Sequence, residues 1–336
     1  MLKIHIITHN DMDGFLWGVL EGWLLSGRIP NDLEVRVSGS LKLLPQSPDF
    51  WETLPSTNAV LFCCTSGDRS NMVRGNQTLD ELGLWDHTVH SDYVHNEALL
   101  YPGVAKKCRW CFVGKRYKWL RVKEQLPLSE WLPRTGIQQR MLRYSPALPW
   151  GLWKDLPMVG VYGLQHRGQH HRKPWVKAMK DLIPGAVLGG VREEDRGVVV
   201  PPIYREVYRG KHNPKYLEFA SRARVGLYLM GGLALGHQFW EFAALRCALL
   251  AMHPSLHPTP EEDTQEWEHF PDPLLEDRDF FYFRNQQEML DKARLLLADP
   301  ELAECMADSV FEKTKFAHSI PRSEYVLAKL REVARP

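Results

Sequence analysis

The sequence predicts an α/β protein with two domains, each built on a parallel β-sheet that is covered by helices on both faces. Its length of 336 residues suits two domains of roughly 150 residues each. Strands and a helix alternate in the first 64 residues, which is typical of a parallel sheet. A second series of this kind begins near residue 157. We therefore expect domains at 1–150 and 151–320, and a closing helix at 321–336.

The composition indicates an ordinary globular protein. It is 44% hydrophobic and 25% charged, so disorder is not expected to dominate. The net charge is +1, so affinity for a polyanion has to come from a local patch of cations. We find no signal peptide and no apolar run long enough to span a bilayer, and we expect a monomeric cytoplasmic protein without a membrane partner.

Short apolar runs mark the strands of the first domain. Residues 3–8 (KIHIIT), 33–37 and 59–64 (AVLFCC) predict buried strands. Between the first two, a turn at 9–14 leads into an apolar helix that ends at Gly27.

Polar residues follow these strands at several points. Asp11 lies in the turn after the first strand, and His87, His90 and Asp92 lie in a segment, 84–97, that is rich in His and Asp. At the carboxyl end of a sheet strand such residues often contact substrate. Their spacing is not that of a known metal motif, and we predict no metal site.

Residues 106–123 carry eight basic residues and no acidic one, interleaved with aromatic residues. Lys and Arg neutralise phosphates and aromatic rings stack on bases, so the segment suggests contact with nucleic acid. A solvated amphipathic element is the alternative. Within it, Cys108 and Cys111 have the spacing of half a zinc or redox site, or are two ordinary thiols. The candidate nucleic-acid contacts are Lys106, Lys107, Arg109, Lys115, Arg116, Lys118, Trp119 and Arg121.

The second domain follows a Pro- and Trp-rich connection at 125–157. Residues 157–162 predict a strand, 163–174 a loop, and the following residues a helix with Pro174 in its first turn. Shorter extended pieces are expected at 186–189 and 198–200, and a helix at 215–223.

The segment 224–250 predicts a buried strand, a glycine-bearing loop and a helix that starts near His237. Such an arrangement can hold a phosphate-bearing ligand, because free backbone N–H groups and the helix dipole point at it. The helix carries one carboxylate, Glu241. The alternative is a buried helix whose Glu241 faces solvent.

The remaining residues close the second domain. An acidic loop is expected at 261–279 and a strand at 279–284. Helices are expected at 285–298, 300–315 and 322–333.

Residues 157–333 resemble the C-terminal domain of GT-B glycosyltransferases, most closely CgeB-like proteins and bacteriophage DNA glucosyltransferases. Arg167 and Arg172 are similar to the family's Arg-x4-Lys pair, which holds the donor diphosphate, with Arg in place of Lys. The segment around Glu241 resembles the one whose Glu binds the nucleotide ribose. Residues 281–313 match a further family segment, and His318 and Arg322 match the H…R of the closing helix.

The resemblance implies two Rossmann-like domains that face each other across a cleft, and a nucleoside diphosphate sugar, expected to be UDP-linked, as donor. Arg suits this task because it contacts phosphate oxygens with two N–H groups and keeps its charge. Fixed cations stabilise the charge that develops on the leaving diphosphate, so no metal cofactor is required. The donor-binding residues implied are Arg167, Arg172, Lys173, Gly163, His237 and Glu241.

Two departures from the family pattern leave the stereochemistry open. Positions 233 and 249 are Leu, where retaining members often carry a second Glu, and Arg246-Cys247 replaces a pair of small residues. An inverting enzyme needs a base near the acceptor hydroxyl. The candidates are Asp92, His90, His87 and Asp11, which we expect at the carboxyl ends of strands.

The best acceptor candidate is a hydroxymethylated pyrimidine in phage DNA, in a bacterial or phage-infected cell. The basic, aromatic segment and the resemblance to phage enzymes favour it. A glycan or a protein is the alternative acceptor. Two other classes stay open: a metal-dependent phosphoesterase, because residues 8–14 (THNDMDG) resemble the first DHH motif, and a non-catalytic nucleic-acid-binding protein.

Overall fold

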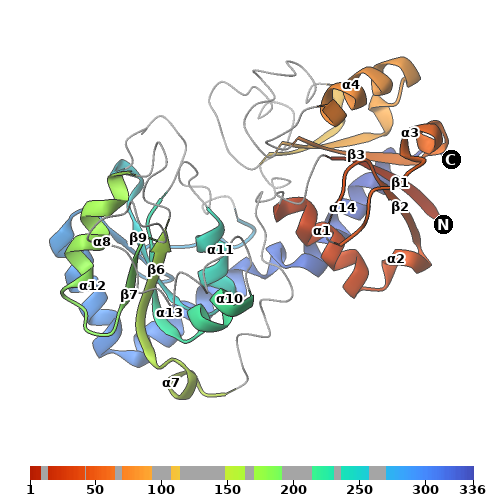
Figure 1. Cartoon of the computed structure of the whole chain (residues 1–336). Helices are drawn as coiled ribbons and strands as arrows, with labels where there is room; N and C mark the ends of the chain where they lie inside the picture. Colours follow the sequence, from red (N-terminus) through yellow and green to blue (C-terminus); the bar gives the residue numbers. More distant parts are fainter. Residues whose placement is uncertain are drawn as a thin grey trace. The chain divides into compact units, whose positions relative to one another are not determined.

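A computed structural model describes most of the chain (Figure 1). The described residues are 1–8, 14–41, 43–64, 70–92, 107–113, 148–162, 170–190, 214–230, 236–256 and 270–336. They form two compact units. Unit 1 comprises Met1–Gln139 and Phe316–Pro336, and unit 2 comprises Arg140–Lys315. The end of the chain therefore returns to the first unit.

Unit 1 is built on a five-stranded parallel sheet with the order β2-β1-β3-β4-β5. The central strands β1 and β3 are almost wholly apolar, as expected for strands that are buried on both faces. The strands are β1 (Leu2–Ile7), β2 (Leu33–Val37), β3 (Ala59–Cys64), β4 (Thr88–Asp92) and β5 (Trp110–Val113).

Helices cover both faces of this sheet. Ile4 and Ile6 of β1 pack with the apolar sides of α1 and α14, whereas Ile7 and Phe62 pack with α3 and α4 on the other face. The helices are α1 (Gly14–Leu25), α2 (Arg28–Asn31), α3 (Phe50–Thr53), α4 (Ser70–Leu82) and α14 (Ser319–Val333), with the 3-10 turns η1 (Leu54–Ser56) and η2 (Trp85–His87).

The two helices α1 and α14 are in close contact, although they are about 300 residues apart in the sequence. A Cβ atom on Gly22 of α1 would lie 2.1 Å from the backbone oxygen of Ser319, so only glycine fits there. Trp23 Nε1 donates a hydrogen bond to the Ser323 carbonyl (2.9 Å), and Ser319 Oγ donates one to Glu21 Oε2 (2.8 Å). These buried contacts fix α14 as part of unit 1.

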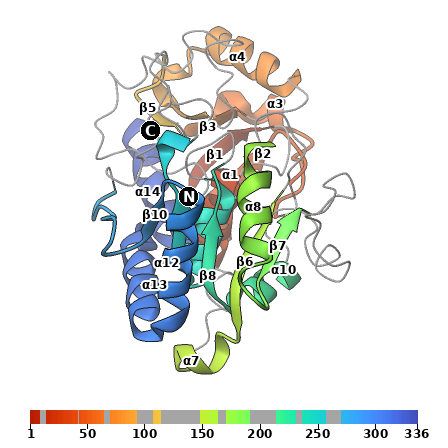
Figure 2. The same cartoon turned by 90° about the vertical axis from the view of Figure 1, so that its left-hand side faces the viewer.

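Unit 2 contains a second parallel sheet, with the order β10-β9-β8-β6-β7. Its strands are β6 (Leu156–Tyr162), β7 (Val187–Gly190), β8 (Ala223–Tyr228), β9 (Ala248–Met252) and β10 (Phe281–Phe283). In Figure 1, α8 and α12 lie on one side of this sheet and α10 and α11 on the other; Figure 2 shows the same unit turned by 90°.

The helices of unit 2 are α7 (Trp150–Trp153), α8 (Lys173–Lys180), α10 (Pro214–Ser221), α11 (His237–Ala244), α12 (Gln286–Ala298) and α13 (Pro300–Thr314). The 3-10 turns are η6 (His170–Arg172) and η8 (Pro254–Leu256), and η10 (Lys315–Ala317) joins α13 to α14.

The α/β class with two parallel sheets is confirmed, as are the strands predicted at 157–162, 225–229 and 279–284 and the helices predicted from His237 and at 285–298, 300–315 and 322–333. The helices α2, α3 and α4 and the strands β4 and β5 of unit 1 were not predicted. The extended piece expected at 198–200, the acidic loop up to residue 269 and most of the 125–157 connection lie outside the described residues. Within the described ranges, no helix combines the length and apolar character needed to cross a membrane.

Candidate functional site

The helix α8 begins with a run of cations. The turn η6 (His170–Arg172) leads directly into Lys173, and no acidic residue lies in the first turn of α8. Cations at a helix N-terminus lie against the positive end of the helix dipole, which is unfavourable by a few tenths to about 1 kcal/mol each. A bound anion would offset the positive charges of Arg172 and Lys173 and the positive end of the helix dipole. The start of α8 therefore suits a phosphate-bearing ligand.

Arg172 is fixed by the end of strand β8. Its Nε donates a hydrogen bond of 2.9 Å to the Met230 carbonyl oxygen, and its side chain is only 9% exposed. His171 Nε2 lies 2.9 Å from the same oxygen, which can only accept, so this nitrogen carries the proton. Two side chains from η6 thus converge on one backbone atom just after β8.

The start of helix α11 is held at the same edge of the sheet. The N–H of its N-cap residue Gly236 donates a hydrogen bond of 2.7 Å to the Tyr228 hydroxyl at the end of β8. Gln238 Nε2 donates to the Val161 carbonyl near the end of β6. The carboxyl ends of β6 and β8 therefore position the N-terminus of α11.

Glu241 lies on α11 and is 4% exposed. The alternative in which this carboxylate faces solvent is therefore wrong. The helix lies close to the sheet because Gly226 of β8 leaves room for Phe242, whose ring would be 2.6 Å from a Cβ atom at that position. Burial of a carboxylate in an apolar helix is unfavourable unless partners satisfy it, so the position of Glu241 depends on polar contacts.

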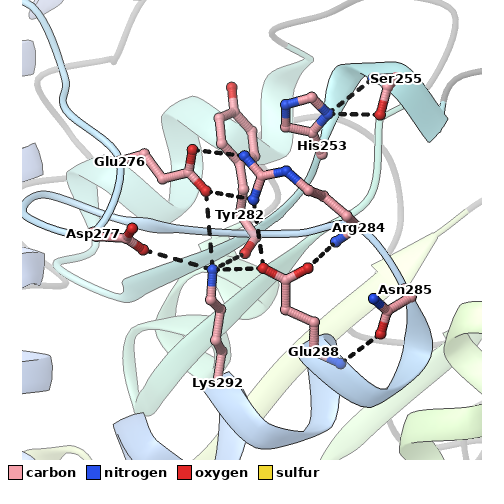
Figure 3. A network of polar contacts seen from close by, with 9 residues as sticks. All are labelled: His253, Ser255, Glu276, Asp277, Tyr282, Arg284, Asn285, Glu288 and Lys292. Atoms are coloured by element: carbon pink, nitrogen blue, oxygen red, sulfur yellow. Dashed lines mark hydrogen bonds and ion pairs between the residues drawn. The ribbon is translucent and has the colours of Figure 1, made fainter.

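A polar network lies beyond the ends of β9 and β10 (Figure 3). Arg284 pairs with Glu276 (2.7 Å) and more weakly with Glu288 (3.4 Å), while Lys292 Nζ lies 2.8 Å from Glu288. The hydrogen bonds from Arg284 hold the pKa of Glu276 below its usual value. Burial, aided by the positive charge of Arg284, lowers the pKa of His253. Because these cations are already paired, the network stabilises the loop before β10 and is not part of the candidate site.

The predicted bases of unit 1 occupy different positions. His87 lies in η2, before β4, and its Nδ1 is 2.7 Å from the Val333 carbonyl of α14. His90 is in the middle of β4, fully buried, with its Nδ1 3.1 Å from the Phe62 carbonyl. The expectation that both lie at the carboxyl end of a strand is therefore wrong. Asp92 is the last residue of β4, whereas Asp11 lies outside the described residues.

A buried polar cluster at the ends of β1 and β2 was not recognised in the sequence. Ser38 Oγ accepts from the Thr8 N–H (2.9 Å) and donates to the Thr8 carbonyl (2.7 Å). Asn71, in the first turn of α4, donates to the Thr8 and Ser38 carbonyls. These side chains fix the backbone from which the Asp11 segment departs. No local sequence pattern indicates these contacts, because they depend on which strands are neighbours in the sheet.

Two of the predicted nucleic-acid contacts in the segment 106–123, Lys107 and Arg109, have described side chains. Lys107 Nζ pairs with Asp80 (2.7 Å) and lies over the Trp85 ring. Arg109 is exposed and lies over the ring of Trp110. The Nζ atom of Lys329 in α14 also lies over the Trp110 ring, 3.8 Å from its centroid, so Trp110 packs within unit 1. The other predicted contacts lie outside the description: Lys106, Lys115, Arg116, Lys118, Trp119 and Arg121.

Several predicted donor-site residues also lie outside the described part of the chain. Gly163 and Arg167 belong to the undescribed segment after β6, and the side chain of His237 is not described although its backbone starts α11. Across the described residues, no group of three or more His, Cys, Asp or Glu side chains is arranged to hold a metal ion. The Cys108 side chain is buried.

No protein-family model and no curated protein matches the sequence. Solved structures do match over the whole chain. An alpha-glucosyltransferase in complex with UDP has a TM-score of 0.61 at 12% identity and covers 99% of both chains. An alpha-glucosyltransferase in complex with UDP and a 13-mer DNA containing an HMU base has a TM-score of 0.59 at 12% identity, covering 99% of this chain and 98% of the other.

The HepE protein of Anabaena in complex with UDP has a TM-score of 0.54 at 10% identity, covering 99% of this chain and 100% of the other. At such low identity the similarity concerns the fold. The chain is thus similar in fold to GT-B glycosyltransferases, as the sequence predicted.

Proposed function

We propose that the protein is a glycosyltransferase that transfers a sugar from a UDP-linked donor to an acceptor hydroxyl. The observation that carries the proposal is the convergence of Arg172, the start of α8 and the start of α11 at the carboxyl edge of the unit 2 sheet. In an open α/β sheet this edge is where ligands bind. The similarity in fold to structures that contain UDP supports the same ligand here.

Each donor-site residue has a distinct proposed task. Arg172, with Arg167 and Lys173, contacts the diphosphate and stabilises the charge that develops on it as the glycosidic bond breaks. Because Nε of Arg172 is bound to Met230, the remaining N–H groups of the guanidinium are restricted in orientation. The buried carboxylate of Glu241 accepts hydrogen bonds from the ribose hydroxyls. Gly163 and His237 complete the backbone around the phosphates.

We propose hydroxymethylated pyrimidine in DNA as the acceptor, with a glycan or a protein as the alternative. Support comes from the cations and aromatic residues of 106–123 and from similar structures that contain DNA. If the reaction inverts, Asp92 or Asp11 acts as base, because His90 is buried and the Nδ1 atoms of both His87 and His90 are engaged by backbone carbonyls.

The test incubates the purified protein with radiolabelled UDP-glucose and duplex DNA containing hydroxymethylcytosine, with unmodified DNA as control. Other nucleotide sugars are used in parallel. Label in the modified duplex alone supports the whole proposal. Sugar release from a donor together with failure to label DNA moves the acceptor to a glycan or protein. If no nucleoside diphosphate binds or reacts, the transferase proposal is wrong.

The donor site is tested separately with Glu241→Ala and Arg222→Ala. Arg222 is an exposed cation of the same unit, paired with Asp155, and its loss is expected to leave activity unchanged. The Glu241 variant is expected to raise the KM for the donor about tenfold or more, because a buried hydrogen-bonding carboxylate is removed. Full activity and unchanged donor affinity in this variant would contradict the assignment.

A further inference from the structure

The inference concerns how the start of α11 is held, and it rests on the proposed function. Helices usually begin with Ser, Thr, Asp or Asn, whose side chain accepts a hydrogen bond from the second or third backbone N–H of the helix. Here the N-cap residue is Gly236, and within the described residues no side chain caps α11. The helix start is instead held from outside, by the Tyr228 hydroxyl on the Gly236 N–H.

The tyrosine is rigidly placed. Tyr228 is the last residue of β8 and only 2% exposed, and its ring packs edge-on against Phe239 in the first turn of α11 (5.8 Å between centroids). The tyrosine side chain therefore reaches from the end of the strand to the start of the helix. It binds the N–H of the cap residue and not those of the first turn, which are the groups that bind anions at a helix N-terminus.

We infer that Tyr228 is a positioning residue for the diphosphate. Its hydroxyl fixes the N-terminus of α11 at the end of β8, at the same edge of the sheet as Met230 and Arg172, and the glycine cap places no side chain on the N–H groups of the first turn. Tyr228 does not contact the donor. A serine cap would anchor the helix as well, but its side chain would compete with the phosphate for the same N–H groups.

If the Tyr228 hydroxyl anchors the helix and the glycine cap leaves room for phosphate, two different variants are expected to weaken UDP binding. Tyr228→Phe removes only the hydroxyl and is expected to weaken UDP binding about fivefold to tenfold, with uridine affinity unchanged. Gly236→Ser is expected to keep or raise the melting temperature and still weaken UDP binding several-fold. Among the described residues, a Cβ atom at Gly236 meets only the Tyr228 hydroxyl, at the ordinary contact distance of 3.4 Å.

The experiment measures UDP and uridine affinities of the full chain by calorimetry, with the melting temperature of each variant. Tyr216→Phe is the matched control, because Tyr216 is a buried tyrosine of α10 in the same unit. The inference is supported if both variants, but not the control, lower the ratio of UDP affinity to uridine affinity. It is overturned if wild type binds UDP and Tyr228→Phe keeps that ratio, even if the variant is less stable. A wild-type protein that binds no UDP refutes the proposed function as well.

Discussion

Arg172 illustrates how a single side chain is both structural and chemical. One edge of its guanidinium is bound to Met230, and the residue lies at a helix start that already carries positive charge. Lysine would keep the positive charge. It could not donate from Nε and at the same time offer the bidentate geometry of the remaining guanidinium N–H groups. In the proposed function, the diphosphate of the donor compensates these unfavourable electrostatics.

For Arg172→Lys we expect UDP affinity to fall about tenfold, and for Arg172→Ala roughly tenfold to a hundredfold, because charged hydrogen bonds contribute about 1.5–3 kcal/mol each. Calorimetry with UDP measures both. Arg222→Ala serves as the control for loss of a cation from unit 2, and an Arg172→Ala protein with wild-type affinity would exclude phosphate contact.

Lys154 is a buried cation that the proposed reaction does not use. Its Nζ donates to the Leu245 carbonyl at the end of α11 (2.7 Å) and lies 3.6 Å from Cys247 Sγ, with no exposed surface. Burial lowers the pKa of Lys154 from 10.5 to about 8. Below about pH 8 both folded and unfolded chains carry the proton, so the unfavourable burial of charge is fully present.

As the pH rises from about 8 to 10.5, the folded state releases this proton first, and the contribution of Lys154 to the free energy of unfolding is expected to increase by on the order of 3 kcal/mol. Lys154→Met is expected to abolish this increase and to be at least as stable at pH 7. Denaturant unfolding at several pH values tests this, with exposed Lys177→Met as control. Parallel pH profiles of wild type and Lys154→Met would contradict it.

At the scale of elements, how far the sequence predicts the structure depends on the range of the interactions. Apolar runs identify β1, β3 and β8 because a strand buried on both faces needs apolar side chains throughout. The strand β4 reads as polar (TVHSD), and its His90 contacts the Phe62 carbonyl of β3, while His87, just before the strand, contacts the Val333 carbonyl of α14. No local pattern reveals these partners, so both histidines were taken for substrate contacts.

Arg246 shows the same limit at a helix end. It follows α11 in the left-handed region (φ 53), where glycine is favoured, and its side chain pairs with Asp308 of α13 (2.6 Å). Its carbonyl also accepts from Trp150 Nε1 (3.1 Å). The departure from a small residue pair is thus explained by contacts with α7 and α13, which are distant in the sequence. The donor-site elements, in contrast, follow a local strand-loop-helix order and were predicted.

The contact of α1 with α14 leads to a prediction for Gly22. An alanine there would place its Cβ 2.1 Å from the Ser319 oxygen and 2.3 Å from Ser323 Oγ. We expect Gly22→Ala to lower the free energy of unfolding of unit 1 by about 3 kcal/mol, despite the better helix propensity of alanine. Thermal unfolding measures it. Gly151→Ala, where no atom of the described residues lies within 4 Å of the added Cβ, is expected to be neutral or stabilising; equal effects at both positions would refute the packing argument.

At the scale of the whole molecule, the two units differ in whether one continuous stretch of the chain forms them. Unit 2 is one continuous segment, whereas unit 1 is closed by residues 316–336. The α14 side chains Val326, Leu327 and Leu330 belong to the same buried cluster as Ile4 and Ile6 of β1. The sequence predicted the closing helix but not that its contacts are with the first unit, because pairing across 300 residues has no local signature.

Deletion of residues 316–336 is therefore expected to destabilise unit 1 and not unit 2. Hydrogen exchange should show lost protection in β1, β3 and β4, with retained protection in β8 and β9, because only the first core loses its cover. The same truncated chain is expected to retain UDP affinity within about threefold, since the donor-site residues all lie in unit 2. Protection kept throughout, or lost in unit 2 first, would contradict this division.

The position of α14 also has a consequence for biosynthesis. A ribosome that adds 5–20 residues per second needs roughly 10–35 seconds to make the residues of unit 2. During that interval the nascent first unit has its sheet and α1 but not the helix that covers them, and Leu16, Val19 and Leu20 lack their final packing. The second unit is complete before the first, reversing the usual order in which domains mature along a message. Translation speed through 140–315, and any chaperone that shields α1 meanwhile, should set the yield of native protein.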